Sequence, residues 1–408
     1  MAPSGDVNDQ FGFSVALYND VLAIGSFRDD QSANDAGAVY FFRNTGNWTF
    51  EQKVAYSMGQ PDDFFGYAVD LDADQCIIGA YLDDDNGTNS GSAFIYAFDG
   101  SVWSQEQKLV PSNGASGDAF GFSVSIDGDY AVCGAYAMDI AASAAGVVSV
   151  WKRNGTWTEV AQITASDAAT DDWLGYSVQL QDSTILAGAF HNDDLGSESG
   201  SMYLFRYDGA NWIEELNVFA SDGDLTKEFA KVVAMDWPYV FAGSAKNNPN
   251  GTNSGSAYAY DLCTYRPAQQ ICVATVDTMS NQNRVFWNKP VTTLIDSFHL
   301  IRDGSELTAI PYGQFASYED FSAQPNLAAY EYELITKNFC GVPSDTSTLH
   351  RTIFLEAQPS GSDVILNWTP AAGFTFPYYR TWRDDNGDGN YTLIFATLSG
   401  QLTYTDMG

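Results

Sequence analysis

The protein has 408 residues, and its 18 Lys and Arg against 52 Asp and Glu give a formal net charge of −34 at pH 7 with histidines neutral. Phosphates and anionic lipid headgroups attract basic surfaces, so this charge excludes nucleic acid as a partner. Apolar residues make up 45% of the chain and aromatic residues 14%, so it can form buried cores and is expected to fold into two or three domains.

The N-terminus lacks the basic start and apolar stretch of a signal peptide, and no apolar run approaches the roughly 18 residues that a membrane-spanning helix needs. We therefore expect no direct membrane insertion. Met1-Ala2 followed at once by polar residues is typical of an initiator placed on a fragment of a larger protein, although a cytoplasmic protein would begin in the same way.

An internal repeat organises residues 1–262. A motif close to Asp-x-Phe-Gly-(Phe/Tyr)-Ser-Val begins at Asp9, Asp63, Asp118 and Asp172, and a degenerate fifth copy surrounds Ala230. Repetition at a fixed period indicates one structural unit used several times. Three sets of glycines keep the same register of 54 or 55 residues: Gly12, Gly66, Gly121 and Gly175; Gly25, Gly79, Gly134, Gly188 and Gly243; and Gly37, Gly91, Gly146, Gly200 and Gly255.

Each copy is expected to form four short antiparallel strands separated by Asn, Asp, Gly and Ser turns, which is the size of one propeller blade. In the first copy these strands are Phe11–Leu17, Val21–Gly25, Ala38–Phe42 and Trp48–Val54. A tryptophan opens the fourth strand of four copies and is expected to pack between blades: Trp48, Trp103, Trp157 and Trp212. Because no equivalent Trp follows Tyr260, the fifth copy is expected to lack its fourth strand.

The repeated Phe-Gly, followed some 13 residues later by Gly-Ser or Gly-Ala as in Ile24-Gly25-Ser26, resembles the FG-GAP repeat, the blade unit of the integrin α-subunit head. The resemblance covers residues 5–262 and implies an all-β fold with a β-propeller of five visible repeats. It is closer to the bacterial form, because the proline of the second motif is missing and the tight turn Tyr18-Asn19-Asp20 stands where integrins carry a calcium loop. Neither end supplies a closing strand, so either the ring closes without one or further blades precede residue 1.

Strands of a different spacing follow the repeats. We expect residues 263–270 to be a linker and residues 271–356 to form an Ig-like or fibronectin III-like β-sandwich, with strands at Val273–Val276, Arg284–Trp287, Ser297–Ile301, Ala329–Ile335 and Arg351–Leu355. Trp287 is expected to be buried. A second start at Val364–Trp368 predicts a truncated second sandwich over residues 357–408.

The five cysteines leave two pairings open. Cys76 and Cys133 lie in repeat strands and are expected to be buried apolar residues. Cys272 and Cys340 fall at the same pole of a seven-stranded sandwich, so a Cys272–Cys340 disulfide is predicted, with Cys263–Cys272 as the alternative. Either disulfide would indicate an oxidising compartment and an extracellular or cell-surface location.

Two acidic features are candidate calcium sites, and calcium is the only cofactor that the sequence suggests. Asp384, Asn386 and Asp388 have the spacing of the first half of a calcium loop, but the distal Glu is absent, so a solvated hairpin tip is the alternative. The loops after each Gly-(Ser/Ala) carry a second set of candidate ligands, which could instead cap loop backbone amides: Asp83, Asp85, Asp193 and Asp194.

No catalytic motif is present, and the three histidines have neither metal-ligand spacing nor a neighbouring nucleophile. We therefore expect a non-enzymatic protein of the secreted or cell-surface adhesion class, whose propeller loops bind a protein or glycan while the sandwiches act as a stalk. The alternatives are a structural accessory module of a larger surface enzyme or fibre, and a propeller enzyme with a carboxylate pair in its channel. The sequence predicts no oligomeric state.

Overall fold

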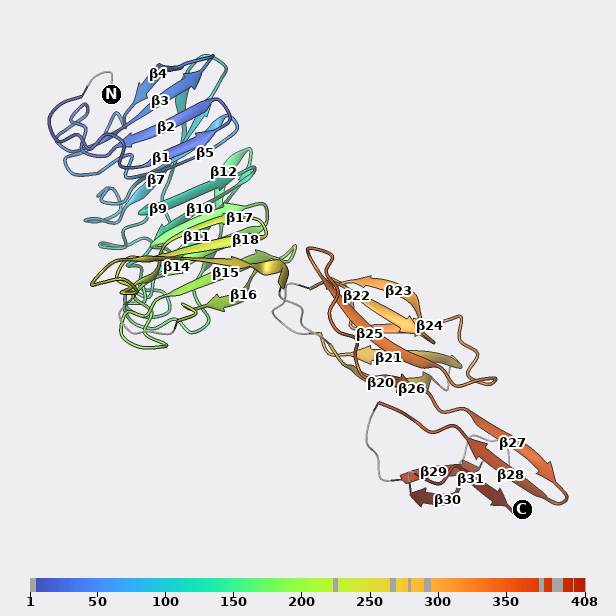
Figure 1. The fold of residues 1–408 in the computed structure, drawn as a ribbon. Coiled ribbons are helices and arrows are strands. Elements are labelled where there is room, and N and C mark those ends of the chain that lie inside the picture. The colour runs from blue at the N-terminus through green and yellow to red at the C-terminus, as the bar shows by residue number, and fades with distance from the viewer. Residues whose placement is uncertain are drawn as a thin grey trace. The chain divides into compact units, whose positions relative to one another are not determined.

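The computed structural model describes residues 5–222, 227–264, 269–277, 280–289, 295–373, 378–383, 392–398 and 400–407. The chain divides into two compact units, Met1–Leu262 and Cys263–Gly408 (Figure 1). The regular structure in the described ranges is β-strand apart from a single 3₁₀ turn, Leu262–Thr264. None of the described segments is a helix long and apolar enough to cross a bilayer.

The first unit is a series of antiparallel sheets, one for each repeat (Figure 1). The first four sheets have four strands in sequential order: β1 (Val15–Tyr18), β2 (Val21–Ser26), β3 (Ala38–Asn44) and β4 (Trp48–Val54); β5 (Ala68–Asp72), β6 (Gln75–Ala80), β7 (Ser92–Phe98) and β8 (Trp103–Leu109); β9 (Ser123–Asp127), β10 (Tyr130–Ala135), β11 (Val147–Asn154) and β12 (Thr156–Ile163); β13 (Ser177–Gln181), β14 (Thr184–Ala189), β15 (Ser201–Tyr207) and β16 (Trp212–Val218).

The fifth repeat forms a three-stranded sheet of β17 (Phe229–Asp236), β18 (Tyr239–Ser244) and β19 (Ser256–Asp261). This confirms the prediction that the fourth strand is missing from the described part of this copy. The predicted start of the first strand at Phe11 is wrong, because β1 begins at Val15. Gln10 and Gly12 have φ angles of 57° and 92°, so the Phe-Gly pair forms a turn before the strand.

Successive repeats are joined by an unusually close approach of two backbones. A Cβ atom on the second-strand glycine of repeats one to four would lie 1.9 or 2.0 Å from a carbonyl oxygen of the following repeat. These pairs are Gly25 with Gly66, Gly79 with Gly121, Gly134 with Gly175, and Gly188 with Ala230. Because no other residue lacks Cβ, only glycine allows the next turn to sit on this strand.

The third glycine set makes a second such junction. A Cβ on Gly37 would lie 2.0 Å from the carbonyl oxygen of Phe65, and Gly37 and Phe65 form a parallel β-bridge between the first two repeats. The same contact recurs at Gly91, Gly146 and Gly200. Each repeat therefore binds the next turn at two glycines, which explains why these two glycine sets stay in register.

Side chains add directional hydrogen bonds to each junction. The carboxylate of Asp70 on β5 accepts the N–H of Ile126 on β9 at 2.9 Å. In the next two junctions the acceptors on the first strand are Ser125 and Gln179. Unpaired backbone N–H groups on the first strand, which is an edge strand of its sheet, are costly to bury, so these acceptors fix the position of each following first strand.

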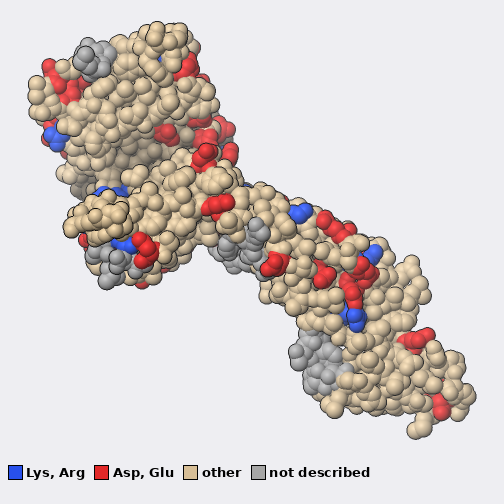
Figure 2. Space-filling view, in the orientation of Figure 1, with Lys and Arg blue, Asp and Glu red and all other residues tan. Residues whose placement is uncertain are grey.

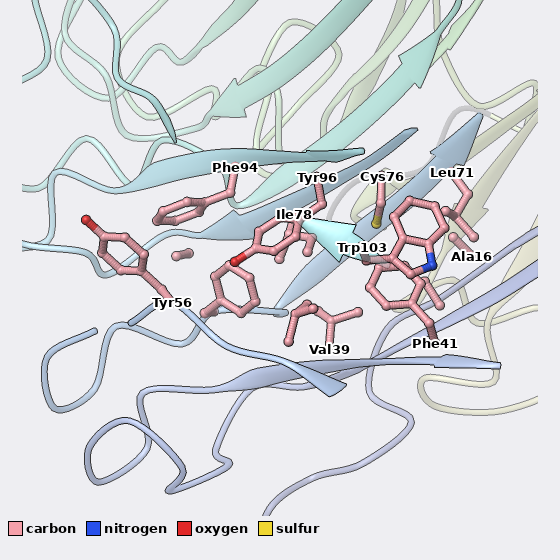
Figure 3. Packing of buried hydrophobic residues seen from close by; sticks show 14 of the residues in the cluster. Ala16, Val39, Phe41, Tyr56, Leu71, Cys76, Ile78, Phe94, Tyr96 and Trp103 are labelled. Carbon is pink, nitrogen blue, oxygen red and sulfur yellow. The ribbon is translucent and has the colours of Figure 1, made fainter. Parts of the chain in front are cut away.

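Apolar packing fills the space between neighbouring sheets. Figure 3 shows the cluster shared by the first two repeats, in which Trp103 stacks on Phe41 with ring centroids 4.2 Å apart and an interplanar angle of 5°. The backbone of Trp103 also forms two hydrogen bonds of 2.7 Å with the Gln52 amide. The predicted packing of the tryptophans between blades is confirmed for Trp103, whereas Trp48 in the first repeat is 44% exposed.

The second unit contains two groups of strands (Figure 1). In the first, two sheets share one core: β20 (Ile271–Asp277), β21 (Gln282–Trp287) and β24 (Ser317–Asp320); and β23 (Ser305–Pro311), β22 (Ile295–Arg302), β25 (Glu331–Asn338) and β26 (His350–Arg351). The second group has sheets of β27 (Leu355–Ser360), β28 (Asp363–Trp368) and β31 (Thr403–Asp406), and of β29 (Tyr378–Arg383) and β30 (Thr392–Leu398).

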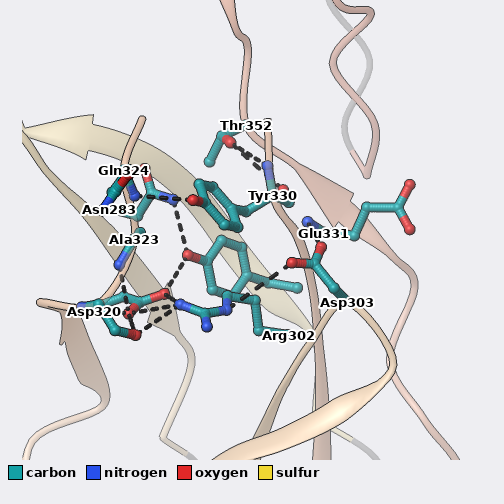
Figure 4. Close-up of polar contacts among 11 residues, drawn as sticks. Asn283, Arg302, Asp303, Asp320, Ala323, Gln324, Tyr330, Glu331 and Thr352 are labelled. Atoms are coloured by element: carbon teal, nitrogen blue, oxygen red, sulfur yellow. Dashed lines mark hydrogen bonds and ion pairs between the residues drawn. The ribbon is translucent and has the colours of Figure 1, made fainter. Parts of the chain in front are cut away.

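The predicted strand Arg351–Leu355 is wrong, because β26 ends at Arg351 and β27 begins at Leu355. Trp287 is buried as predicted. Beside the core, Asp320 accepts hydrogen bonds from the Tyr332 hydroxyl at 2.8 Å and the Arg302 guanidinium at 2.8 Å (Figure 4). Hydrogen bonds from Ser322, Tyr332 and Arg302, together with the Arg302 charge, hold the pKa of the Asp320 carboxyl below its ordinary value despite burial.

The disulfide joins Cys263 to Cys340, so the predicted Cys272–Cys340 pair and its Cys263–Cys272 alternative are both wrong. Cys272 is an exposed free thiol at the start of β20. The prediction placed Cys263 in a linker, whereas its carbonyl accepts a hydrogen bond from the Asn338 amide at 2.8 Å and so lies beside the end of β25. Cys76 and Cys133 are buried free thiols, as predicted, and burial raises both pKa values.

Candidate functional site

The Phe-Gly turns and the loops after the second strands meet at one end of the repeats, which we call the FG rim. Aromatic side chains from four consecutive repeats touch one another along this rim. We call them the aromatic band: Phe13, Phe27, Phe64, Tyr67, Tyr81, Phe122, Tyr136, Trp173, Tyr176 and Phe190.

Phe122 lies at the centre of the aromatic band. Its ring centroid is 5.0 Å from Tyr67 and 5.1 Å from Tyr81 in the preceding repeat. It is 4.7 Å from Tyr136, which directly follows β10, and 4.5 Å from Tyr176, which directly precedes β13 of the next repeat. Edge and tilted contacts at these distances are favourable, so the rings position one another across repeat boundaries.

Most rings of the aromatic band are half-buried, and Phe13 is exposed. Partial burial raises the pKa of Tyr67, Tyr81, Tyr136 and Tyr176, so their phenol groups stay neutral at physiological pH. The band therefore presents uncharged ring faces and hydroxyls on a protein that is otherwise strongly acidic. Figure 2 shows the predominance of Asp and Glu over Lys and Arg on one face of the molecule.

Basic side chains already lie over rings at both ends of the band. The Arg28 guanidinium carbon is 5.6 Å from the Phe27 ring centroid and 5.5 Å from that of Phe64. At the other end the Lys231 ammonium lies 4.7 Å from the Phe190 centroid. Both distances fall within the range of cation–π attraction, so the ring faces of this band accept cations.

The acidic loops predicted as a calcium site directly follow the band residues in sequence. Asp83 is buried and accepts the backbone N–H of Asp85 at 3.0 Å. The Lys108 ammonium from β8 lies 2.8 Å from Asp83 and also pairs with Asp85. A protein cation thus lies between the two carboxylates that calcium would need to bind.

In the equivalent loop of the fourth repeat the two aspartates have different hydrogen-bond partners. Asp193 caps the N–H of Glu198 at 2.7 Å, while Asn192 takes the buried place that Asp83 has in the second repeat. Asp194 accepts the Asn192 side-chain amide at 3.4 Å. The Asp193 contact is the capping of a loop backbone amide that the sequence left open as the alternative to metal binding, whereas Asp194 accepts a side-chain amide.

Asp384, Asn386 and Asp388 lie outside the described residues. Within the described ranges, no group of three or more His, Cys, Asp or Glu side chains is arranged to hold a metal ion. Calcium binding therefore stays a prediction.

The aromatic band was not predicted from the sequence, although its signal is present. An aromatic residue follows each Gly-(Ser/Ala) pair in four copies, and another follows each Phe-Gly or Leu-Gly pair. The first set is Phe27, Tyr81, Tyr136 and Phe190, and the second is Phe13, Tyr67, Phe122 and Tyr176. Only the fold shows that the two sets meet at one rim.

Comparison with known families agrees with this arrangement. The FG-GAP repeat family matches residues 1–42, 48–96, 103–151 and 157–205. The first half of this chain consists of FG-GAP repeats. The fifth copy lies beyond the matched residues, but its three strands follow the same order as those of the matched FG-GAP repeats. No curated protein matches the chain.

In the four matched repeats an aspartate stands shortly before the Phe-Gly or Leu-Gly pair and closes the turn that leads into it. Asp9, Asp63, Asp118 and Asp172 are all buried, and each accepts the backbone N–H of the residue three positions earlier at 2.6 Å. Burial, with smaller contributions from Asp83 and Asp84, raises the pKa of Asp63 from 3.8 to about 6. Burial also raises the pKa of Asp118 and Asp172.

The raised pKa of Asp63 predicts a pH-dependent stability. A carboxyl that binds its proton more tightly in the folded chain stabilises that chain as pH falls, so the melting temperature should rise as pH is lowered from above 6 toward 4. Asp63→Asn keeps an acceptor for the Gln60 N–H and removes the titration. Thermal melts should show a flatter pH profile for this variant, and an unchanged profile would contradict the assignment.

The ion pairs of Lys108 with Asp83 and Asp85 predict that calcium does not bind between these two carboxylates. Lys108→Met removes the ammonium from Asp83 and Asp85 and leaves two carboxylates facing each other, which favours a divalent cation. Millimolar calcium should therefore raise the melting temperature of Lys108→Met more than that of the unmodified chain, each compared with chelator. Equal shifts in the two proteins would show that calcium acts elsewhere, whereas a larger shift in the unmodified chain would contradict the pairing.

Proposed function

We propose that this chain is a secreted or cell-surface recognition protein, whose aromatic band binds a protein ligand through Lys or Arg side chains. FG-GAP repeats are found in adhesion and surface proteins. The observation that carries the proposal is a continuous row of rings, most of them half-buried, with Arg28 over Phe27 and Phe64 at one end and Lys231 over the buried Phe190 at the other.

Charge supports a basic partner. The net charge of −34 attracts cationic proteins over a distance, and this attraction raises the rate at which they encounter the chain. Long-range attraction alone has little specificity. The rings of the aromatic band supply a short-range contact that depends on geometry, since a cation gains most directly over a ring face.

The rigid arrangement of the rim supports recognition over catalysis. The carboxylates of the acidic loops are engaged in capping and ion pairs, as at Asp29, which accepts the Tyr40 hydroxyl and the Lys53 ammonium, both at 2.8 Å. Such groups hold the loops in place, so the exposed rings keep a defined spacing. Binding sites commonly lie on loops that a stable scaffold fixes in this way.

The same proposal covers the cellular location of the protein and the role of its second unit. The Cys263–Cys340 disulfide favours an oxidising compartment, in keeping with an extracellular or cell-surface protein. The strand order of the second unit repeats itself, with β20-β21-β24 matched by β27-β28-β31. We propose that these are fibronectin III-like domains that serve as a stalk for the FG-GAP repeats.

The experiment measures binding of labelled oligo-arginine and oligo-lysine peptides, with oligo-glutamate and neutral oligosaccharides as further probes. Phe122→Ala removes the central ring without changing the net charge. It should weaken binding of the basic peptides roughly 2- to 30-fold, the loss expected for a cation–π contact of about 0.5–2 kcal/mol. Phe42→Ala is the matched control, because Phe42 is also half-buried against another ring but lies on β3, outside the aromatic band.

Equal binding of basic peptides by Phe122→Ala and Phe42→Ala would contradict the proposed site, since charge alone would then explain the affinity. If a neutral oligosaccharide binds instead and Phe122→Ala abolishes that binding, the ligand class is a glycan and the basic-protein proposal is overturned. Melting temperatures of both variants check that each is folded.

A further inference from the structure

The outer strands of the first repeats are joined by a glutamine side chain, which we call the glutamine clamp. Gln52 accepts the backbone N–H of Trp103 in the next repeat and donates to its carbonyl, both at 2.7 Å. Gln107 binds the backbone of Trp157 in the same way, at 2.9 and 2.7 Å. The clamp satisfies backbone groups of a strand that lies at the edge of its sheet and so has a ladder partner on one side only.

A carboxylate accompanies the clamp in the first junction. Glu51 accepts the Arg43 guanidinium at 2.6 Å and the Trp103 indole N–H at 3.2 Å. The Arg43 guanidinium also lies over the Phe98 ring of the second repeat, 4.6 Å from its centroid. One basic side chain thus makes an ion pair and a cation–π contact at the same junction.

The third repeat has neither the glutamine nor the carboxylate. The residues at these two positions of β12 are Val160 and Ala161, and the β-bulge of the outer strand falls at the same place as in the first repeat. Alkyl side chains neither donate nor accept hydrogen bonds. The backbone of Trp212, which opens the outer strand β16 of the fourth repeat, therefore receives no clamp from these positions.

A basic side chain at this junction is left without an acid. Lys152 corresponds to Arg43, since both pair with the first residue of the second strand of their sheet. Arg43 pairs with Glu51, whereas none of the ion pairs formed in the described part of the chain includes Lys152. The Lys152 ammonium lies over the Tyr130 ring, 4.9 Å from its centroid. It therefore has a ring contact, as Arg43 does, but lacks the carboxylate.

A cavity of about 410 Å³ lies at this junction, and Lys152 and Val160 are among the residues that line it. Three aromatic rings form part of its wall: the Tyr130 centroid is 5.8 Å from that of Trp212 and 6.1 Å from that of Tyr207. All of its lining residues belong to the first unit. Its size and its aromatic wall with a few polar groups are typical of a small-molecule site, for which about 300–1,000 Å³ is usual.

The polar groups at this cavity include donors that lack an acceptor. The Trp212 indole Nε1 has no hydrogen-bond partner among the described residues, whereas that of Trp103 donates to Glu51. The Trp157 indole lacks a partner too, so the cavity and the lysine, rather than the indole, distinguish this junction. A carboxylate placed beside Lys152 would supply the charge that the first junction takes from its own chain.

We propose that this cavity binds a saccharide unit that carries a carboxylate, that is, a uronic acid. The carboxylate pairs with Lys152, as Glu51 pairs with Arg43 in the first junction. The hydroxyl groups both donate and accept hydrogen bonds, so they can bind the backbone N–H and carbonyl of Trp212 in place of a glutamine clamp. The C–H face of the sugar ring packs against the aromatic wall, which provides apolar surface to bury.

The net charge of −34 opposes a polyanion far more than a ligand with one carboxylate. At physiological ionic strength, charges more than about 8 Å apart are largely screened, so a single carboxylate responds mainly to the lysine beside it. A long anionic polymer would also lie against the acidic surface around the cavity. The site is separate from the aromatic band, because none of its lining residues belongs to the band.

The test titrates the full chain by calorimetry at physiological salt with the methyl glycosides of glucuronic and galacturonic acid. The neutral methyl glucoside and methyl galactoside differ from them only at the carboxylate, and N-acetylglutamate offers a carboxylate without a sugar ring. An acidic glycoside should bind saturably at millimolar concentrations, roughly 10-fold or more tightly than its neutral counterpart, as expected for a hydrogen bond to a charged group. Lys152→Met should remove this preference and leave the melting temperature nearly unchanged.

A second variant fills the cavity with the side chains of the first junction. Val160→Glu combined with Ala161→Gln supplies a carboxylate to Lys152 and an amide to the Trp212 backbone. This double variant should lose binding while its melting temperature stays the same or rises, so unfolding would not explain the loss. Val102→Glu is the matched control, because Val102 is 47% exposed against 49% for Val160, gains the same charge and lies outside the cavity.

Binding of an acidic glycoside by the unmodified chain and by Val102→Glu, but not by the double variant, would support the proposal. Failure of both acidic glycosides to bind the unmodified chain, or equal binding by the double variant, would overturn it. Equal affinity for the acidic and neutral glycosides would show that Lys152 does not select a carboxylate. Binding of N-acetylglutamate as tightly as the glycosides would assign the cavity to an amino-acid carboxylate and overturn the saccharide.

Discussion

The first unit depends on one steric condition, the absence of a Cβ atom where the turn of one repeat rests on the second strand of the repeat before it. A backbone carbonyl occupies that space at four successive junctions. Backbone atoms cannot rotate away as a long side chain can, so the position tolerates glycine alone. The spacing of the repeats, the stacking of Trp103 on Phe41 and the hydrogen bonds to the next first strand all follow from this close approach.

The FG rim is a direct consequence of the same junction. Because each Phe-Gly turn is held against the previous repeat, the aromatic residue after it meets the aromatic residue after the neighbouring Gly-(Ser/Ala) pair. The contact of Phe122 with Tyr81 is an example. A recognition surface thus arises from the scaffold itself.

Much of the fold could be predicted from the sequence, because repeated glycines and tryptophans carry strong local signals. The four strands per repeat and the missing strand of the fifth were predicted correctly. The start of β1 was predicted wrongly. Phe11 is apolar and extends the strand pattern in the sequence, but the positive φ of Gly12 does not allow the strand to begin before it. The disulfide was misassigned since Cys263 was placed in a linker, and spacing alone does not show which cysteine lies near Cys340.

The candidate site was harder to predict than the fold. Acidic loops suggested calcium, but the sequence does not show that Lys108, more than 20 residues after Asp83, reaches back to it from β8. The aromatic band was missed for the same reason, since its rings come from four repeats and only the junction brings them together. Sites built from distant residues need the tertiary contacts that local patterns do not contain.

The most direct test of the junction compares Gly79→Ala with Gly243→Ala in urea unfolding of the first unit, at low protein concentration. Both changes place one methyl group at the same strand position of two repeats, but only at Gly79 does a neighbouring carbonyl lie 2.0 Å from it. Gly79→Ala should lower the free energy of unfolding by about 1–3 kcal/mol or more, the cost of overpacking, while Gly243→Ala should change it by less than about 0.5 kcal/mol. Equal effects of the two substitutions would contradict the account.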